Sequence, residues 1–322
     1  MKVKVKSNTN IALVKYWGKK SDRLKTPLNN SISMTLDNLY TTTSAELIDD
    51  DKDIIFFNGK EANKDTKIIK FIDLFRRDFN LNNKKLKIET QNNFPTASGL
   101  ASSASGFSAL SLAVSKAFGI ELTQKELSIY SRLGSGSASR SIFGGFAEWL
   151  KGEKEDGSDS YAIQLADEKY WDINMIVCIV VQDKKDKSST DGMKETVETC
   201  PFYPIWLETI DNDLKNVREG IINKDLEKIG LTMEHNCLKM HSTMFTTQPS
   251  IIYWKPKTLE IIHLVKELRK NGLNCYFTID AGANVKILSE NKDTNKIVSF
   301  LSNYLEKENI IVCSAGEGTQ VI

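Results

Sequence analysis

The sequence has almost no excess of charge of either sign. Its 322 residues include 43 lysines and arginines and 42 aspartates and glutamates, which gives a formal net charge of +1. Proteins that bind nucleic acid or membranes through a broad basic surface carry an excess of positive charge. We therefore expect neither nucleic acid nor a membrane as a partner, and any cluster of lysines has to act locally.

Cysteine and long apolar runs are also scarce. The five cysteines are widely spaced and form no CxxC pair, which predicts reduced thiols and no structural zinc. The longest apolar run covers residues 175–181, a length that suits a buried strand and is far too short to span a membrane. Residues 1–6 alternate lysine with valine and are followed by no apolar stretch typical of a signal peptide. We expect a cytoplasmic protein.

The chain is long enough for two domains that share a cleft. Its first third is rich in strand patterns, including residues 1–15, which we interpret as one strand, a break at the asparagines, and a second strand over 11–14. Its second half has helical periodicity over 202–217, 225–244 and 256–271. The pattern predicts a mixture of sheet and helix.

A run of small side chains at residues 94–107 departs from the rest of the sequence. It reads FPTASGLASSASGF and leads into a helical spacing that ends at Gly119. Small residues at a helix N-terminus leave backbone N–H groups open to an anion, and the helix dipole favours negative charge there. The run is neither a Walker A loop nor a GxGxxG turn. It predicts a phosphate cradle, with a close-packed helix contact or a flexible linker as the alternative.

Three further clusters place basic residues beside small or aromatic ones. These are KYWGKK at 15–20, GSGSASRSIFGG at 134–145 and KKDKSSTDGM at 184–193. A guanidinium group can bind a carboxylate or a phosphate bidentately, so Arg140 is a candidate ligand for either. Each cluster also has a plainer interpretation: a lysine-rich hairpin tip, an exposed surface arginine and a solvated charge run.

One carboxylate and two histidines complete the candidates. Asp280 follows a predicted strand over 274–279, where it could cap its own turn or point into a cleft. The pattern leaves both possibilities open. His235 and His241 lack the spacing that would place them together on one helix face, and we interpret both as packing or surface residues.

Six motifs, taken together and in order, closely resemble the diphosphomevalonate decarboxylase family of the GHMP kinase superfamily. They read IALVKYWGKK, PLNNSISMTL, FPTASGLASSASG, GSGSASRSIFGG, KKDKSSTDGM and FTIDAGANV and cover almost the whole chain. The resemblance implies an α+β GHMP kinase fold with two α/β lobes around a deep cleft. The N-terminal lobe, residues 1–183, would resemble domain 2 of ribosomal protein S5 and carry the ATP phosphate loop. The C-terminal lobe, residues 184–322, would be related to ferredoxin-like folds and complete the substrate cleft.

The resemblance also implies an activity. The family uses ATP and Mg²⁺ to phosphorylate the tertiary 3-hydroxyl of (R)-mevalonate 5-diphosphate, and phosphate and CO₂ then leave to give isopentenyl diphosphate in isoprenoid biosynthesis. The alternative is a related enzyme that acts only as a mevalonate 3-kinase or that acts on mevalonate 5-phosphate. Family members commonly form homodimers, so a homodimer is expected.

Residue roles follow from the same resemblance. Asp280 would be the catalytic carboxylate near the 3-hydroxyl, as a base or an orienting group, and Lys15 would hold it ionised. The residues implied for substrate binding are Tyr16, Lys19, Ser135, Ser137, Arg140 and Ser189. Those implied for ATP are Pro95, Ala97, Ser98, Gly99, Leu100, Ala101, Ser102, Ser103 and Lys184, with Ser102 or Ser103 on magnesium. Thr190 stands where some bacterial members have arginine, so one substrate-phosphate contact of those members would be missing or replaced.

Overall fold

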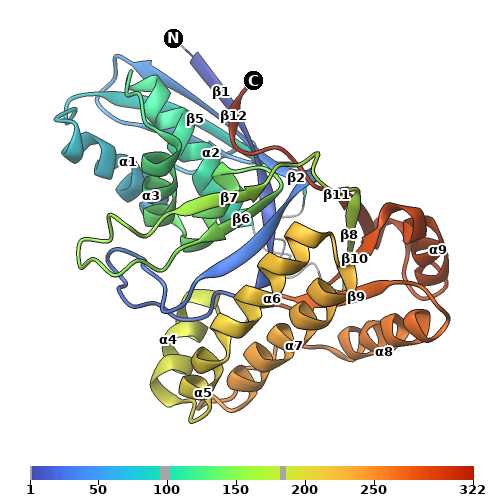
Figure 1. Cartoon of the computed structure of the whole chain (residues 1–322). Coiled ribbons are helices and arrows are strands. Elements are labelled where there is room, and N and C mark those ends of the chain that lie inside the picture. The colour runs from blue at the N-terminus through green and yellow to red at the C-terminus, as the bar shows by residue number, and fades with distance from the viewer. Residues whose placement is uncertain (1, 95–101, 182–185) are drawn as a thin grey trace.

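The computed structural model describes residues 2–94, 102–181 and 186–322, which form two lobes, each built on its own sheet (Figure 1). The first sheet is mainly antiparallel and runs, in spatial order, β12 (Gln320–Val321), β1 (Lys2–Val14), β2 (Ser31–Ile48), β5 (Lys85–Asn92), β3 (Ile54–Phe57) and β4 (Lys60–Glu61), with β6 (Phe146–Trp149) paired to β2 and β7 (Ala162–Ala166) paired to β6. The helices of this lobe are α1 (Thr66–Asp78), α2 (Ser102–Ala117), α3 (Gln124–Gly134) and the 3-10 helix η1 (Gly136–Ile142). The predicted α+β fold class is confirmed.

The second sheet is antiparallel throughout its described strands. Its order is β11 (Ile310–Ser314), β8 (Ile173–Cys178), β10 (Val285–Glu290) and β9 (Cys275–Ile279). The helices of this half are α4 (Ser189–Thr199), α5 (Tyr203–Glu208), α6 (Ile210–Asn223), α7 (Leu226–Phe245), α8 (Pro256–Lys270), α9 (Asn291–Leu301) and the 3-10 helix η2 (Lys307–Asn309). Strand β8 therefore belongs to the second sheet, although it precedes the boundary predicted after residue 183.

Strand β1 is continuous from Lys2 to Val14, so the prediction of a break at the asparagines was wrong. Asparagine favours turns when its side chain bonds the neighbouring backbone. Here both side chains bond distant carbonyls instead, Asn8 that of Glu317 and Asn10 that of Ser137. The strand shifts its register against β2 between the two asparagines and continues.

Two helix boundaries also differ from the sequence pattern. Helix α2 begins at Ser102, so the end of the small-residue run is helical rather than loop. The predicted helix over 202–217 is two helices, α5 and α6, because the Thr209 hydroxyl bonds the Trp206 carbonyl and competes with the backbone ladder. The predicted capping box at Thr123 and Glu126 is present at the start of α3.

A shared core joins the two lobes. Its buried side chains come from β1 and β2 of the first sheet, from β8 of the second, and from α6 and α7. Members of this core include Ile11, Leu13, Met34, Met175, Val177, Val217 and Met233. Because this core lies between the sheets, the ends of β1 and β9 are held at a fixed separation. Of the helices described, none is both long and apolar enough to cross a membrane.

Candidate active site

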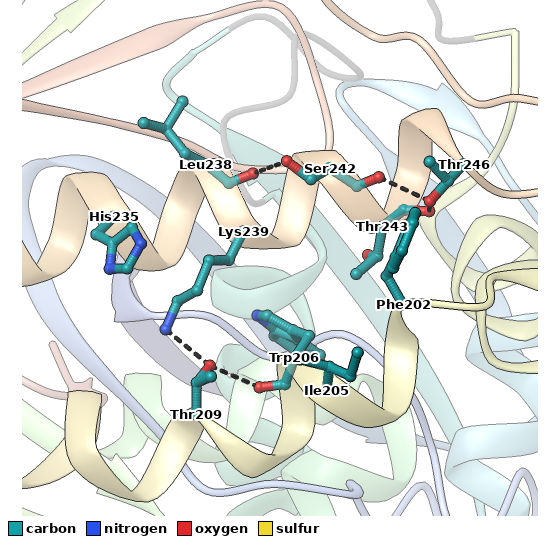
Figure 2. A pocket seen from close by; sticks show the side chains of 10 residues that line it. All are labelled: Phe202, Ile205, Trp206, Thr209, His235, Leu238, Lys239, Ser242, Thr243 and Thr246. Carbon is teal, nitrogen blue, oxygen red and sulfur yellow. Dashed lines mark hydrogen bonds between the residues drawn. The ribbon is translucent and has the colours of Figure 1, made fainter.

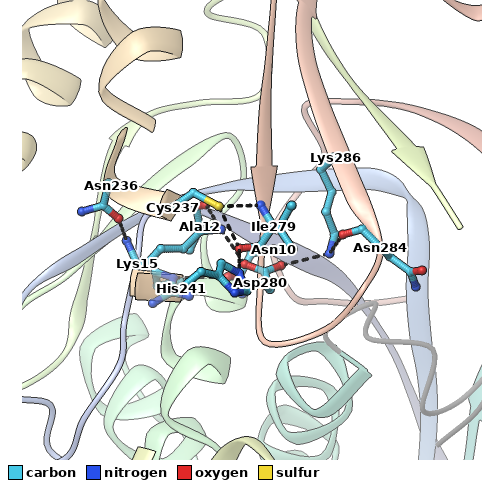
Figure 3. A network of polar contacts seen from close by, with 11 residues as sticks. Asn10, Ala12, Lys15, Asn236, Cys237, His241, Ile279, Asp280, Asn284 and Lys286 are labelled. Carbon is cyan, nitrogen blue, oxygen red and sulfur yellow. Dashed lines mark hydrogen bonds and ion pairs between the residues drawn. The ribbon is translucent and has the colours of Figure 1, made fainter. Parts of the chain in front are cut away.

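The end of β1 and the consecutive strands β9 and β10, which are distant from β1 in sequence, converge on one carboxylate (Figure 3). Lys15 directly follows β1, Asp280 directly follows β9, and Lys286 is the second residue of β10. Nζ of Lys15 lies 2.7 Å from Oδ1 of Asp280, and Nζ of Lys286 lies 3.4 Å from Oδ2. Each carboxylate oxygen is thus paired with its own lysine. Asp280 does not simply cap its turn.

The two lysines keep Asp280 ionised. Burial by itself would raise the pKa of the carboxyl group, but the charges of Lys15 and Lys286 outweigh burial and lower the pKa well below its usual range. The Asp280 side chain exposes 27% of its surface, whereas Lys15 and Lys286 expose 2% and 1%. The cluster therefore offers solvent an ionised carboxylate backed by two buried cations.

The backbone around Lys15 is fixed by asparagine side chains. Its N–H donates to Oδ1 of Asn236 over 2.8 Å, and its carbonyl accepts from Nδ2 of Asn29 over 2.8 Å. Asn236 is itself held by a bond to Asp213 of 2.7 Å. The ammonium group of Lys15 also donates to the Ala12 carbonyl over 2.9 Å. The lysine is held in place before any ligand arrives.

The histidines behave as predicted. Nε2 of His241 lies 3.3 Å from the Ile279 carbonyl oxygen, and its ring packs 4.9 Å from that of Trp254. Burial lowers the pKa of His241 to about 3, so its imidazole is neutral at physiological pH. His235 is exposed on α7. One is a packing residue and the other a surface residue.

Arg140 is buried rather than exposed on a loop. Its Nε donates to Oδ1 of Asn10 over 3.2 Å and its Nη1 to Oγ of Ser31 over 2.6 Å. Burial lowers the pKa of Arg140 to about 10, while the charge of Asp280 opposes that effect. The side chain is a desolvated, oriented cation in the same electrostatic field as Asp280, and the surface-arginine interpretation was wrong.

Tyr16 offers a buried hydroxyl to this interior. Among the described residues its oxygen has no hydrogen-bond partner, and burial raises its pKa. The ring packs edge-on against Trp149 with centroids 4.8 Å apart. A Cβ at Gly136 would lie 2.7 Å from Trp149 and 3.1 Å from the Tyr16 ring, so the aromatic wall requires glycine there. An unpaired buried hydroxyl is costly unless a ligand completes it.

Serines connect this wall to helix α2. Oγ of Ser135 lies 3.3 Å from Oγ of Ser103 and 3.5 Å from Oγ of Ser137. Ser102 and Ser103 form the first turn of α2. Nζ of Lys19, in the segment that follows β1, lies 2.9 Å from Oδ1 of Asp22. The two small-residue motifs predicted from sequence, at the starts of α2 and η1, therefore face each other.

Not every predicted residue falls inside this cluster. Ser189 is the first residue of α4, whose N-cap is Ser188. The ATP residues Pro95, Ala97, Ser98, Gly99, Leu100, Ala101 and Lys184 lie outside the described residues.

The sequence analysis missed Asn10, Asn236 and Lys286. The available signal for Lys286 was a lysine inside the apolar strand run VKIL. For the two asparagines there was none, because β1 and α7 give no hint that their polar side chains meet at Lys15 and Arg140.

A largely apolar hollow is separate from this site. A pocket of about 340 Å³ lies between α5 and α7 (Figure 2). Its lining includes Phe202, Ile205, Leu238 and Lys239 and none of the predicted site residues. The hollow and the polar cluster around Asp280 therefore share no residue.

Magnesium fits the start of α2 only as an ion shared with phosphates. Within the described ranges, no group of three or more His, Cys, Asp or Glu could hold a metal, whereas Ser102 and Ser103 supply hydroxyl oxygens. Mg²⁺ prefers oxygen ligands, keeps several waters and is commonly bound through substrate phosphates. The donor set suits a nucleotide-bound magnesium.

Comparison with known proteins agrees with this geometry. The diphosphomevalonate decarboxylase-like N-terminal domain matches residues 7–162, and the mevalonate 5-diphosphate decarboxylase C-terminal domain matches residues 175–320. The diphosphomevalonate decarboxylase of Candida albicans is 35% identical, over 92% of this chain and 86% of its own length. The human diphosphomevalonate decarboxylase is 35% identical, over 87% and 74%.

Solved structures are similar over the full chain. Mevalonate diphosphate decarboxylase from Staphylococcus aureus is 40% identical with a TM-score of 0.94, covering 100% of this chain and 98% of that one. The structure of MDDEF in complex with MVAPP, AMPPCP and magnesium is 40% identical with a TM-score of 0.93, covering 100% and 99%. The chain belongs to the diphosphomevalonate decarboxylase family.

Proposed function

We propose that the protein catalyses the ATP-dependent decarboxylation of (R)-mevalonate 5-diphosphate to isopentenyl diphosphate, with ADP, phosphate and CO₂ as the other products. The observation that carries this proposal is the ionised Asp280 between Lys15 and Lys286, in the field of the buried Arg140. The relatives whose names describe this activity cover most of the chain.

Asp280 orients the 3-hydroxyl and stabilises charge rather than acting as a strong base. A carboxylate whose pKa is held well below its usual range has little affinity for a proton. It still accepts a hydrogen bond from the hydroxyl and aligns its oxygen for in-line attack on the γ-phosphoryl group of ATP. As the new O–P bond forms and the bond to ADP breaks, the hydroxyl proton passes to an oxygen of the transferred phosphoryl group. Phosphoryl transfer depends mainly on such positioning and on charge neutralisation.

The loss of phosphate and CO₂ uses the negative charge of Asp280 as well. When the C3–O bond to the new phosphate breaks, positive charge develops at C3. The C1–C2 bond electrons form the C2=C3 double bond, and C1 leaves as CO₂. The fixed negative charge of Asp280, held without reorganisation by two lysines, stabilises the developing cation.

The ends of the substrate need different partners. Arg140 takes the carboxylate, and Tyr16, Lys19, Ser135 and Ser137 take the diphosphate, with Ser189 helping to position the chain between them. The buried hydroxyl of Tyr16, which has no partner among the described residues, supports this division, because a phosphate oxygen would satisfy it.

The phosphates of ATP would bind at the first turn of α2, and the family resemblance assigns ATP binding to the small-residue run 95–101 and to Lys184 as well. Ser102 and Ser103 would hold a magnesium ion, which would neutralise phosphate charge when bound. The two lobes, with β8 already in the second one, enclose both substrates. We further propose a cytoplasmic homodimer, which light scattering of the purified protein would test.

The decisive experiment supplies ATP, Mg²⁺ and mevalonate 5-diphosphate and measures ADP, CO₂ and isopentenyl diphosphate. ADP without CO₂ would favour the 3-kinase alternative, and turnover with mevalonate 5-phosphate but not with the diphosphate would favour the monophosphate enzyme. Either result would overturn the proposal.

The Asp280→Asn variant tests the role of the carboxylate. We expect kcat to fall at least about a hundredfold with ATP affinity nearly unchanged, since the amide cannot carry the negative charge. Asp78→Asn is the matched control, because Asp78 is also ion-paired, with Arg77 at 2.8 Å, and 32% exposed, but lies at the end of α1. Near-normal turnover in Asp280→Asn would refute the assigned role.

A further inference from the structure

Lys25 is a lysine that neither the family resemblance nor the proposed chemistry uses. It lies in the loop between Lys19 and Pro27, which are joined by an isolated β-bridge. Its φ of +52° places it in the left-handed region, which is uncommon for a residue with a long side chain. The ammonium group turns inward and donates to the carbonyl of Gly134, the last residue of α3.

This position is next to the predicted diphosphate site. Gly134 immediately precedes Ser135, whose hydroxyl contacts Ser103 at 3.3 Å. Nζ of Lys25 also lies 5.8 Å from the centre of the Phe107 ring. Because Phe107 is four residues after Ser103 on α2, both side chains lie on one face of that helix, about one turn apart. Lys25 thus reaches the junction of α2, α3 and η1 from the loop side.

The surroundings of Lys25 are electropositive. The charged groups that face it are Lys19 from its own loop and Lys67 from α1, while α2 and α3 present the Phe107 ring and the Gly134 carbonyl. In the part of the chain that the structure describes, no carboxylate forms an ion pair with Lys25, whereas its neighbour Lys19 pairs with Asp22. Partial burial, together with the charges of Lys19 and Lys67, lowers the pKa of Lys25 to about 8. Such a group gains much from an arriving anion.

We propose that Lys25 is an additional phosphate-binding residue. When the substrate binds, the ammonium group of Lys25 moves from the Gly134 carbonyl to the diphosphate of the substrate, beside Lys19 and Ser135. The inference rests on the proposed function. The plainer role is that Lys25 only caps the C-terminal end of α3, where a cation is favoured by the helix dipole.

The test compares Lys25→Met, which keeps most of the aliphatic chain but not the charge, with Lys25→Arg. A charge-assisted phosphate contact predicts that Lys25→Met raises KM for mevalonate 5-diphosphate about tenfold, with kcat and KM for ATP within about twofold. Lys25→Arg should stay within about threefold of the wild type. Lys257→Met is the matched control, because Lys257 also donates to a backbone carbonyl, that of Tyr304 at 3.2 Å, but on α8.

The pH dependence separates binding from capping. Because Lys25 is protonated below its pKa and the anion needs the protonated form, KM of the wild type should rise above about pH 8, and the rise should be shallower in Lys25→Met. A loss of thermal stability with KM unchanged would show that Lys25 only caps the C-terminal end of α3, and would overturn the proposal. An increase in KM for ATP alone would assign Lys25 to the nucleotide and overturn it as well.

Calorimetry with inorganic pyrophosphate keeps this test independent of turnover. We expect Lys25→Met to weaken pyrophosphate binding about tenfold. If the wild type released no CO₂, the proposed function would fail, but this titration would still test whether Lys25 binds phosphate. Equal pyrophosphate affinity in wild type and Lys25→Met would overturn the proposal.

Discussion

Replacing Lys286 by methionine should raise the pKa of Asp280 without unfolding the site. The change removes a cation 3.4 Å from Oδ2 and leaves Lys15 at 2.7 Å from Oδ1, so the carboxylate keeps one partner. Breaking a buried pair is severe mainly when it leaves a charge uncompensated. Here the lost ammonium group is itself buried, and this desolvation lowers the pKa of Lys286. We expect the free energy of unfolding to change by no more than about 2 kcal/mol.

The size of the pKa change follows from distance and exposure. An opposite charge at such range lowers a carboxyl pKa by about 1–3 units. Since Asp280 is 27% exposed and solvent screens part of the interaction, we expect a rise of about 1–2 units on losing Lys286. Lys15→Met should give the larger rise, since its nitrogen is closer. Asp280 would still be ionised at pH 7 in Lys286→Met, because its pKa starts well below the usual range.

The assay is a ¹³C-carboxyl NMR titration of protein labelled at aspartate, with Asp280→Asn used to assign the resonance. The wild-type resonance should remain in its ionised position to lower pH than that of either lysine variant. The kcat of Lys286→Met should also fall about tenfold, because Oδ2 has lost its anchor. A resonance that titrates identically in wild type and Lys286→Met, or a larger shift for Lys286→Met than for Lys15→Met, would refute the reasoning.

Two further substitutions separate binding from folding. Tyr16→Phe removes a buried hydroxyl without a described partner, so the free energy of unfolding should stay the same or rise by about 1 kcal/mol, while KM for mevalonate 5-diphosphate rises about fivefold; a loss of stability in chemical denaturation would contradict this. Gly18→Ala should cost about 2–4 kcal/mol, because Gly18 has φ of +120° and a Cβ would lie 1.9 Å from the Tyr203 hydroxyl. Gly59→Ala, with φ of +74° and no atom within 4 Å of the added Cβ, should lose only about 1 kcal/mol in the same denaturation series, and equal losses would show that the contact with Tyr203 is unimportant.

Local patterns in the sequence determined much of the secondary structure. The capping box at Thr123, the helix stop near Gly119 and the apolar strand of β8 depend on neighbouring residues, so they could be read directly. The break predicted in β1 failed because the partners of Asn8 and Asn10 are distant carbonyls, which no local pattern encodes.

For the site, the sequence determined the family and several residue identities, among them Asp280, Lys15 and Arg140. Only the tertiary structure decided between a capping aspartate and a paired one, because that choice depends on β1 and β9 ending side by side. The same packing buried Arg140 and added Lys286, which the sequence presents as an ordinary strand lysine. The sequence determines which side chains are present. The pKa of Asp280, however, depends on the distances between charges carried by separate segments, and those distances exist only in the folded chain.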